Sequence, residues 1–155
     1  LRGAGRVIKI KMRPAYHFIA TSIVSGTIYL ASKSESCLII SFVGGFLIDL
    51  DHVIDYYLHE GFNLKVRRFY EFCVKCKFTH LTLIFHSLEC LILFWLAIYF
   101  FKLGNFWLAL GIGITQHMLF DLVVNRDFFK MPYFYFLTLR ILNGFRVKEF
   151  KQNDK

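Results

Sequence analysis

The sequence predicts an all-α, polytopic membrane protein with four transmembrane helices and a C-terminal interfacial amphipathic helix. Of the 155 residues, 56% are hydrophobic and 19% are aromatic, and the mean hydropathy is positive, which is too apolar for an ordinary soluble domain. The apolar residues form long unbroken runs without the alternation of a barrel strand. Basic residues gather at alternate ends of these runs, as several crossings of one membrane require.

Four apolar runs are the predicted spans within a single membrane domain that covers the whole chain. The first two, residues 15–31 and 37–50, are separated by the polar turn "SKSES". The second run is shorter than the about 17 to 25 residues of a typical crossing. Residues 81–101 and 105–124 form a longer pair, separated by a short break. We expect helices, because a helix satisfies its own backbone polar groups in lipid.

The distribution of lysine and arginine predicts the orientation in the membrane. The segment before the first run is basic, as are the stretch 61–78 and the chain after Asn125. In contrast, the turn after the first run has Lys33 offset by Glu35, and the turn after the third has only Lys102. The positive-inside rule then places both termini and the middle loop in the cytoplasm. The predicted location is therefore the cell (inner) membrane, crossed several times.

The N-terminus also fits a second interpretation, that of a signal peptide. A basic start and an apolar stretch are followed by the small residues "LAS" near Ala31, which loosely matches a cleavage site. Cleavage there would leave three spans and would remove His17.

The net charge of +8 indicates the lipid bilayer as the main partner, because lysine and arginine beside a membrane face anionic lipid. The sequence has no motif of interleaved basic and aromatic residues, so no nucleic-acid partner is predicted. Residues 131–147 are aromatic and then basic, which favours an interfacial helix on the inner leaflet or a simple aromatic anchor. Cys73 and Cys76 form a lone "CVKC" in the predicted cytoplasmic loop, which is half of a zinc ribbon and not enough to predict one.

Histidines and acids gather at the predicted cytoplasmic ends of the four runs, and the opposite halves contain neither. An ionised aspartate costs about 2.5 to 3.5 kcal/mol near the membrane centre unless it has a partner. A divalent cation turns the repulsion between such groups into coordination, and imidazole with carboxylate suits zinc most, with manganese or iron possible. The predicted ligands of one or more ions are His17, Asp49, Asp51, His52, His86, His117 and Asp121.

Helical spacing supports three pairs among these residues. His117 and Asp121 are four residues apart, and His86 and Glu89 are three apart, so each pair shares one helix face. Asp49 and His52 have the same three-residue spacing, whereas Asp51 is out of register and indicates an unwound turn, a cap or a second ion. Each signal alone has a simpler interpretation: an interhelical hydrogen bond for "HMLFD", and an acidic helix end that meets water for "DLDH".

The order of these motifs resembles the YdjM-like membrane-bound metal-dependent hydrolases, small inner-membrane proteins of bacteria and archaea. The resemblance covers His17 to Asn125, through the starting histidine, "DLDH", "HS" and "HMLFD". The distant likeness of that family to zinc-dependent phospholipase C implies that the seven predicted residues bind metal or contact its ligands. The family's "HRGxTHS" is replaced here by "HLTLIFHS", which leaves the role of His80 open and makes Glu89 a substitute acid.

The resemblance implies metal-assisted hydrolysis of a phosphoester or lipid-like substrate, such as a phospholipid, at the cytoplasmic membrane face. A bound zinc ion lowers the pKa of its water toward about 7, and Asp51 or Glu89 is the expected general base. The alternative is a non-catalytic metal-binding membrane protein, either a transporter or a sensor. Transport needs polar groups along a path to the opposite face, where the sequence has almost none. A purely structural four-helix protein is the third possibility.

Overall fold

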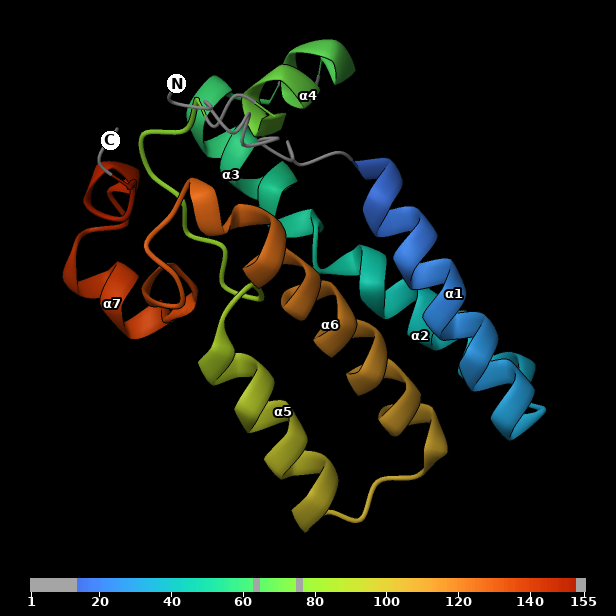
Figure 1. Ribbon diagram of the computed structural model, residues 1–155. Helices are drawn as coiled ribbons and strands as arrows, with labels where there is room; N and C mark the ends of the chain where they lie inside the picture. Colours follow the sequence, from blue (N-terminus) through green and yellow to red (C-terminus); the bar gives the residue numbers. More distant parts are fainter. Residues whose placement is uncertain (1–13, 63–64, 75–76, 153–155) are drawn as a thin grey trace, which may run out of the picture.

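Helices and irregular segments account for the whole of the chain that the structure describes. The computed structural model describes residues 14–62, 65–74 and 77–152 (Figure 1). Within these ranges the chain forms no strand beyond two isolated β-bridges, His80 with Arg146 and Phe129 with Lys151, so the all-α prediction is confirmed. The basic segment before residue 14 and Cys76 of the "CVKC" motif lie outside the described residues.

Seven α-helices follow one another along the described chain. They are α1 (Pro14–Ser32), α2 (Glu35–Leu47), α3 (Leu50–Glu60), α4 (Val66–Val74), α5 (Leu88–Phe100), α6 (Asn105–Val124) and α7 (Leu137–Leu142). Short 3-10 turns occupy Asn125–Asp127, Tyr133–Tyr135 and Val147–Glu149. Side chains of Ser34 and Ser87 accept hydrogen bonds from the first turns of α2 and α5, which fixes where these two helices begin.

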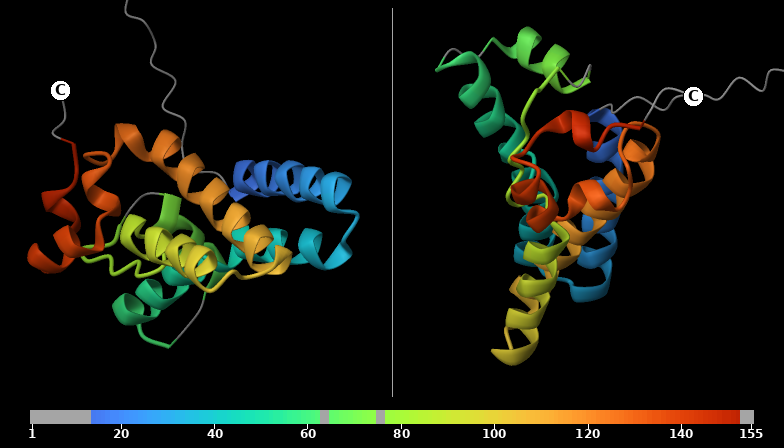
Figure 2. Two further views of the ribbon diagram at one scale, coloured as in Figure 1. Left: turned by 90° about the horizontal axis from the view of Figure 1, so that it is seen from below. Right: turned by 90° about the vertical axis from the view of Figure 1, so that its left-hand side faces the viewer.

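Helices α1, α2 and α6 pack side by side, and glycines allow the close approach (Figures 1 and 2). A β-carbon at Gly113 of α6 would overlap the backbone of Ser41 in α2, and one at Gly44 would meet Leu110. Gly45 likewise lies against Thr21 of α1. Small residues at such crossings are typical of helix packing in membranes.

At one end of this bundle lie α3, α4 and α7 (Figure 1). A turn at residues 48 and 49 separates α2 from α3, so the helix predicted over 37–50 ends at Leu47. The main buried apolar cluster lies at this end, and it includes Tyr56, Phe72, Phe129 and Phe134. The polar residues of the predicted site therefore lie beside an aromatic core and not in the middle of the bundle.

Two further predicted helices differ from the observed ones. The helix predicted over 81–101 begins only at Leu88, because side chains of α3 and α7 bind the backbone of residues 82–86 and hold it in an irregular path. The segment 131–147 is not one interfacial helix: it contains a 3-10 turn and the six-residue α7. The stretch 61–78, expected as a loop or a short amphipathic helix, contains α4.

Two helical stretches are long and apolar enough to cross a bilayer. They run over Glu35–Glu60, with 26 residues, and over Asn105–Asp127, with 23 residues, whereas α5 is apolar but shorter. Length and composition thus support two crossings, and the prediction of four stays a prediction.

Candidate metal centre

The structure brings together histidines and aspartates from distant parts of the chain. His17 lies in the first turns of α1, and His117 and Asp121 lie on α6. Asp49 occupies the turn between α2 and α3, and His86 lies in the irregular segment before α5. Two overlapping groups have ligand atoms within 4.8 Å of one another: His17 with His117 and Asp121, and Asp49 with His86 and His117.

The imidazole Nε2 atoms point at two carboxylates. Asp49 Oδ1 lies 3.4 Å from Nε2 of His117 and 3.6 Å from Nε2 of His86. Asp121 Oδ1 lies 3.3 Å from Nε2 of His17, and Asp121 Oδ2 lies 3.8 Å from Nε2 of His117. His117 therefore stands between the two carboxylates and belongs to both groups.

A hydrogen bond on the far side of the ring makes His117 a suitable metal ligand. Its Nδ1 lies 2.7 Å from the carbonyl oxygen of Gly45, and a carbonyl only accepts, so Nδ1 carries the proton. Nε2 then presents a lone pair to the site. Nε2 of His117 and Nε2 of His86 are buried and have no hydrogen-bond partner. Since unpartnered buried nitrogens are costly, a cation between these histidines and the two carboxylates fits the donor set.

Asp51 lies behind His86. Its Oδ2 accepts hydrogen bonds from the backbone N–H groups of Phe85 and His86, at 2.6 and 3.1 Å, and lies 3.4 Å from Nδ1 of His86. A carboxylate on the far nitrogen of a ligating histidine is a common way to fix its orientation. The geometry therefore makes Asp51 a positioning residue for His86, where the sequence had indicated a ligand or a general base.

His86 is fully buried and lies between Asp49 and Asp51. Burial alone would lower the pKa of its imidazole, but the two carboxylates outweigh burial and raise that pKa from 6.5 to about 9. Without metal, a proton on His86 thus balances the acids, and a bound cation would take over this role.

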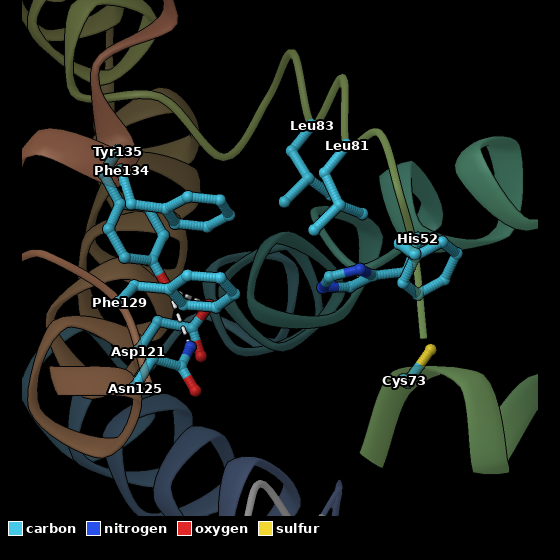
Figure 3. Close-up of a pocket in the computed structure, with 10 residues that line it drawn as sticks. His52, Cys73, Leu81, Leu83, Asp121, Asn125, Phe129, Phe134 and Tyr135 are labelled. Carbon is cyan, nitrogen blue, oxygen red and sulfur yellow. Dashed lines mark hydrogen bonds between the residues drawn. The ribbon is translucent and has the colours of Figure 1, made fainter. Parts of the chain in front are cut away.

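His52 lies at the edge of the cluster. Its Nε2 is 4.0 Å from Asp49 Oδ1, and its ring lies 5.1 Å from the ring of His86, but it belongs to neither of the two groups. Figure 3 shows His52 across a cavity from Asp121, Asn125 and Tyr135. This cavity of about 20 Å³ has room for one water.

Tyr135 and Asn125 hold Asp121 in place. The Tyr135 hydroxyl donates to Asp121 Oδ2 at 3.1 Å, and Asn125 Nδ2 donates to the same hydroxyl oxygen at 2.8 Å (Figure 3). Neither residue was predicted, although Asn125 follows Asp121 by four residues on α6 and its 3-10 extension, a spacing that places both on one face.

Glu89 is not brought to the cluster. Its carboxylate accepts hydrogen bonds from the backbone N–H groups of Leu137 and Thr138, at 2.8 and 3.0 Å, and from the Thr138 hydroxyl. These bonds satisfy the first N–H groups of α7. Glu89 is thus a capping residue in this structure, and its expected role as general base has no geometric support.

Arg140 and Asp55 shape the segment that carries His86, and this role was predicted for neither residue. Arg140 is 1% exposed and donates to the carbonyl oxygens of Thr82 and His86, at 2.8 and 3.0 Å. Asp55 accepts from the backbone N–H groups of Thr82 and Leu83. Leu83 has a φ of 41°, which is rare for a residue with a branched side chain, and these bonds hold it there.

Comparison with protein-family models, with curated proteins and with solved structures found no match to this chain.

Proposed function

We propose that this protein is a membrane-embedded, metal-dependent hydrolase of the YdjM-like type, which acts on a phosphoester or lipid-like substrate at the cytoplasmic membrane face. The convergence of three imidazoles and two carboxylates from four separate segments carries the proposal. Zinc is the proposed ion, because it suits imidazole together with carboxylate, and it would supply Lewis acidity and an activated water.

Exposed apolar side chains support the membrane part of the proposal. Ile23 and Leu30 of α1 are 64% and 67% exposed, and Leu93 and Phe100 of α5 are 64% and 70% exposed. Faces of this kind exceed what soluble proteins usually leave open. In the proposed topology α1, α2, α5 and α6 cross the inner membrane, both termini lie in the cytoplasm, and the metal centre lies at the cytoplasmic ends.

Within the centre the chain's own residues have distinct roles. His17, His86, His117 and Asp121 hold the ion, and Asp51 and Tyr135 orient two of these ligands. Asp49 contacts two of the imidazoles, yet its side chain is 42% exposed. We assign Asp49 the role of a ligand on the open side, from which substrate and water approach.

The test counts bound metal in the purified protein and in two alanine variants. His117→Ala removes the imidazole shared by both groups, so we expect it to lose metal by elemental analysis and to lose hydrolysis of phospholipids and phosphoesters. His59→Ala is the matched control, because His59 lies on α3 among the rings of Phe72 and Phe78 and not in the cluster. We expect this control to keep its metal.

The same assay separates the alternatives. Equal metal in His117→Ala and in the unchanged protein would contradict the proposed centre. Metal that is lost in His117→Ala, without any hydrolysis sensitive to that variant, would favour a non-catalytic metal-binding protein. His80→Ala adds a check on the departure from the family motif: His80 is exposed and bonds to the hydroxyl of Thr79, so we expect no change in metal content.

A further inference from the structure

A cavity of about 260 Å³ opens on the metal centre. Its polar lining includes His17, Asp49 and Asp121 of the centre and the neighbouring His52. The rest of the lining is mostly apolar and comes from α2, α3 and α4, mainly Phe46, Leu50, Val53, Phe69, Tyr70 and Val74. The cavity is thus an apolar chamber with a polar end at the candidate ion.

Helix α4 forms one wall of this chamber. The ring of Tyr56 on α3 packs edge-on against Phe69 and Phe72 of α4, at 5.4 and 5.6 Å between centroids. The basic residues of α4 lie elsewhere: Arg67 has a side chain that is 94% exposed, and Arg68 pairs with Glu60. Helix α4 is therefore amphipathic, and it has an apolar side on the cavity and its cations outside.

We propose that this chamber binds the alkyl chain of a single-chain amphiphile whose phosphate-bearing head lies at the metal centre. The proposal rests on the proposed function and specifies its substrate class. The volume is close to the lower end of the about 300 to 1,000 Å³ typical of ligand pockets, which suits one chain better than two. The walls are mostly apolar and offer few partners to the several hydroxyls of a sugar phosphate, and an unpaired hydroxyl in such a place is unfavourable.

The first experiment compares two phosphonates that share a head and differ in chain length. Methylphosphonate and octylphosphonate are titrated by calorimetry into the metal-loaded protein in nanodiscs, and the signal of empty nanodiscs is subtracted. We expect octylphosphonate to bind at least about tenfold more tightly. This is a modest requirement, because full burial from water gives roughly fourfold for each methylene and these factors multiply along the octyl chain. Equal affinities, or no binding of either probe, would overturn the proposal.

Variants that fill the chamber test whether the alkyl chain of the ligand binds there. Val74→Trp adds bulk from α4, away from the ligands, and we expect it to keep its metal and its affinity for methylphosphonate while it loses the octyl advantage. Val53→Trp fills the chamber from α3 and serves if the first variant does not fold. Leu93→Trp, on an exposed site of α5, is the control and should keep the advantage. An octyl advantage that survives in a folded, metal-loaded chamber variant would overturn the proposal.

Hydrolysis of methyl and octyl phosphoesters by the same samples separates this inference from the proposed function. Chain-dependent binding without hydrolysis would uphold the chamber and contradict the hydrolase. Hydrolysis with equal binding of the two phosphonates would uphold the hydrolase and contradict the chamber.

Discussion

The candidate metal centre has one half built on helices and another half built on irregular chain. His17, His117 and Asp121 lie on α1 and α6, which hold their positions through regular backbone hydrogen bonds and close helix packing. Asp49 and His86 lie in a turn and in an irregular segment. The first three positions follow from the geometry of two helices, whereas the other two depend on side chains elsewhere in the fold.

The helix-built half depends on how closely α6 approaches its neighbours. Gly113 on α6 lies against the backbone of Ser41, and one turn further along the helix His117 bonds to the carbonyl oxygen of Gly45. The same crossing thus sets the distance between the helices and the tautomer of the shared ligand.

The loop-built half depends on charged side chains that bind backbone. Asp51 and Asp55 on α3 accept the N–H groups of residues 82, 83, 85 and 86, and Arg140 on α7 donates to two carbonyl oxygens of the same segment. Aspartates that bind N–H groups and an arginine that binds carbonyl groups replace the bonds that a helix would have made. His86 is held rigidly without being part of a helix.

The largest effect is expected for Gly113→Ala, which disturbs the helix-built half. The new β-carbon would overlap the backbone of Ser41, which cannot rotate away as a side chain can. We expect a loss of stability toward the upper end of the about 1 to 3 kcal/mol typical of overpacking, measured by thermal unfolding in detergent.

Gly26→Ala is the control for this variant, because nothing lies within 4 Å of a β-carbon at Gly26 on α1. Alanine in an open helical position is favoured over glycine by up to about 1 kcal/mol, so we expect no loss or a small gain. If the two variants unfolded alike, the close crossing of α2 and α6 would be contradicted.

A smaller effect is expected for Asp51→Asn, which disturbs the loop-built half. The amide keeps one oxygen for the backbone of residues 85 and 86 but loses the charge that orients His86. We expect a fall in metal affinity of about 10- to 100-fold, as for other outer partners of ligating histidines, measured by competition with a chelator. Asp127→Asn, at a half-exposed position beside Arg126, should leave the affinity unchanged.

Much of the helix-built half could be predicted from the sequence. The long apolar run of α6 and the four-residue spacing of His117 and Asp121 place both candidate ligands on one face. The grouping of histidines and acids at like ends of the apolar runs predicted that α1 and α6 deliver their ligands to one place, and the structure brings His17 to them.

The loop-built half could be predicted only in part. Residues 81–87 are apolar enough to extend the following helix in a pattern-based prediction, and no local signal reports that Arg140, more than fifty residues later, binds their carbonyl groups. For the same reason Glu89 was expected near the metal: a spacing of three from His86 places it on the same face only if both residues are helical, and α5 begins between them.

The protonation of His86 should make the stability of the metal-free protein depend on pH through the loop-built half. The pKa of this imidazole is about 9 in the fold against 6.5 ordinarily, so its proton contributes stability that is fully present below pH 6.5 and is lost as the pH rises through about 9. We expect the metal-free protein to show a falling Tm between these values. Bound metal displaces the proton, so the metal-loaded protein should show a weaker dependence. In the metal-free protein, His86→Gln should remove the pH dependence of Tm. His17→Gln, in the helix-built half, should leave that dependence in place. A metal-free protein whose Tm is level across this range would contradict a charged His86 between Asp49 and Asp51.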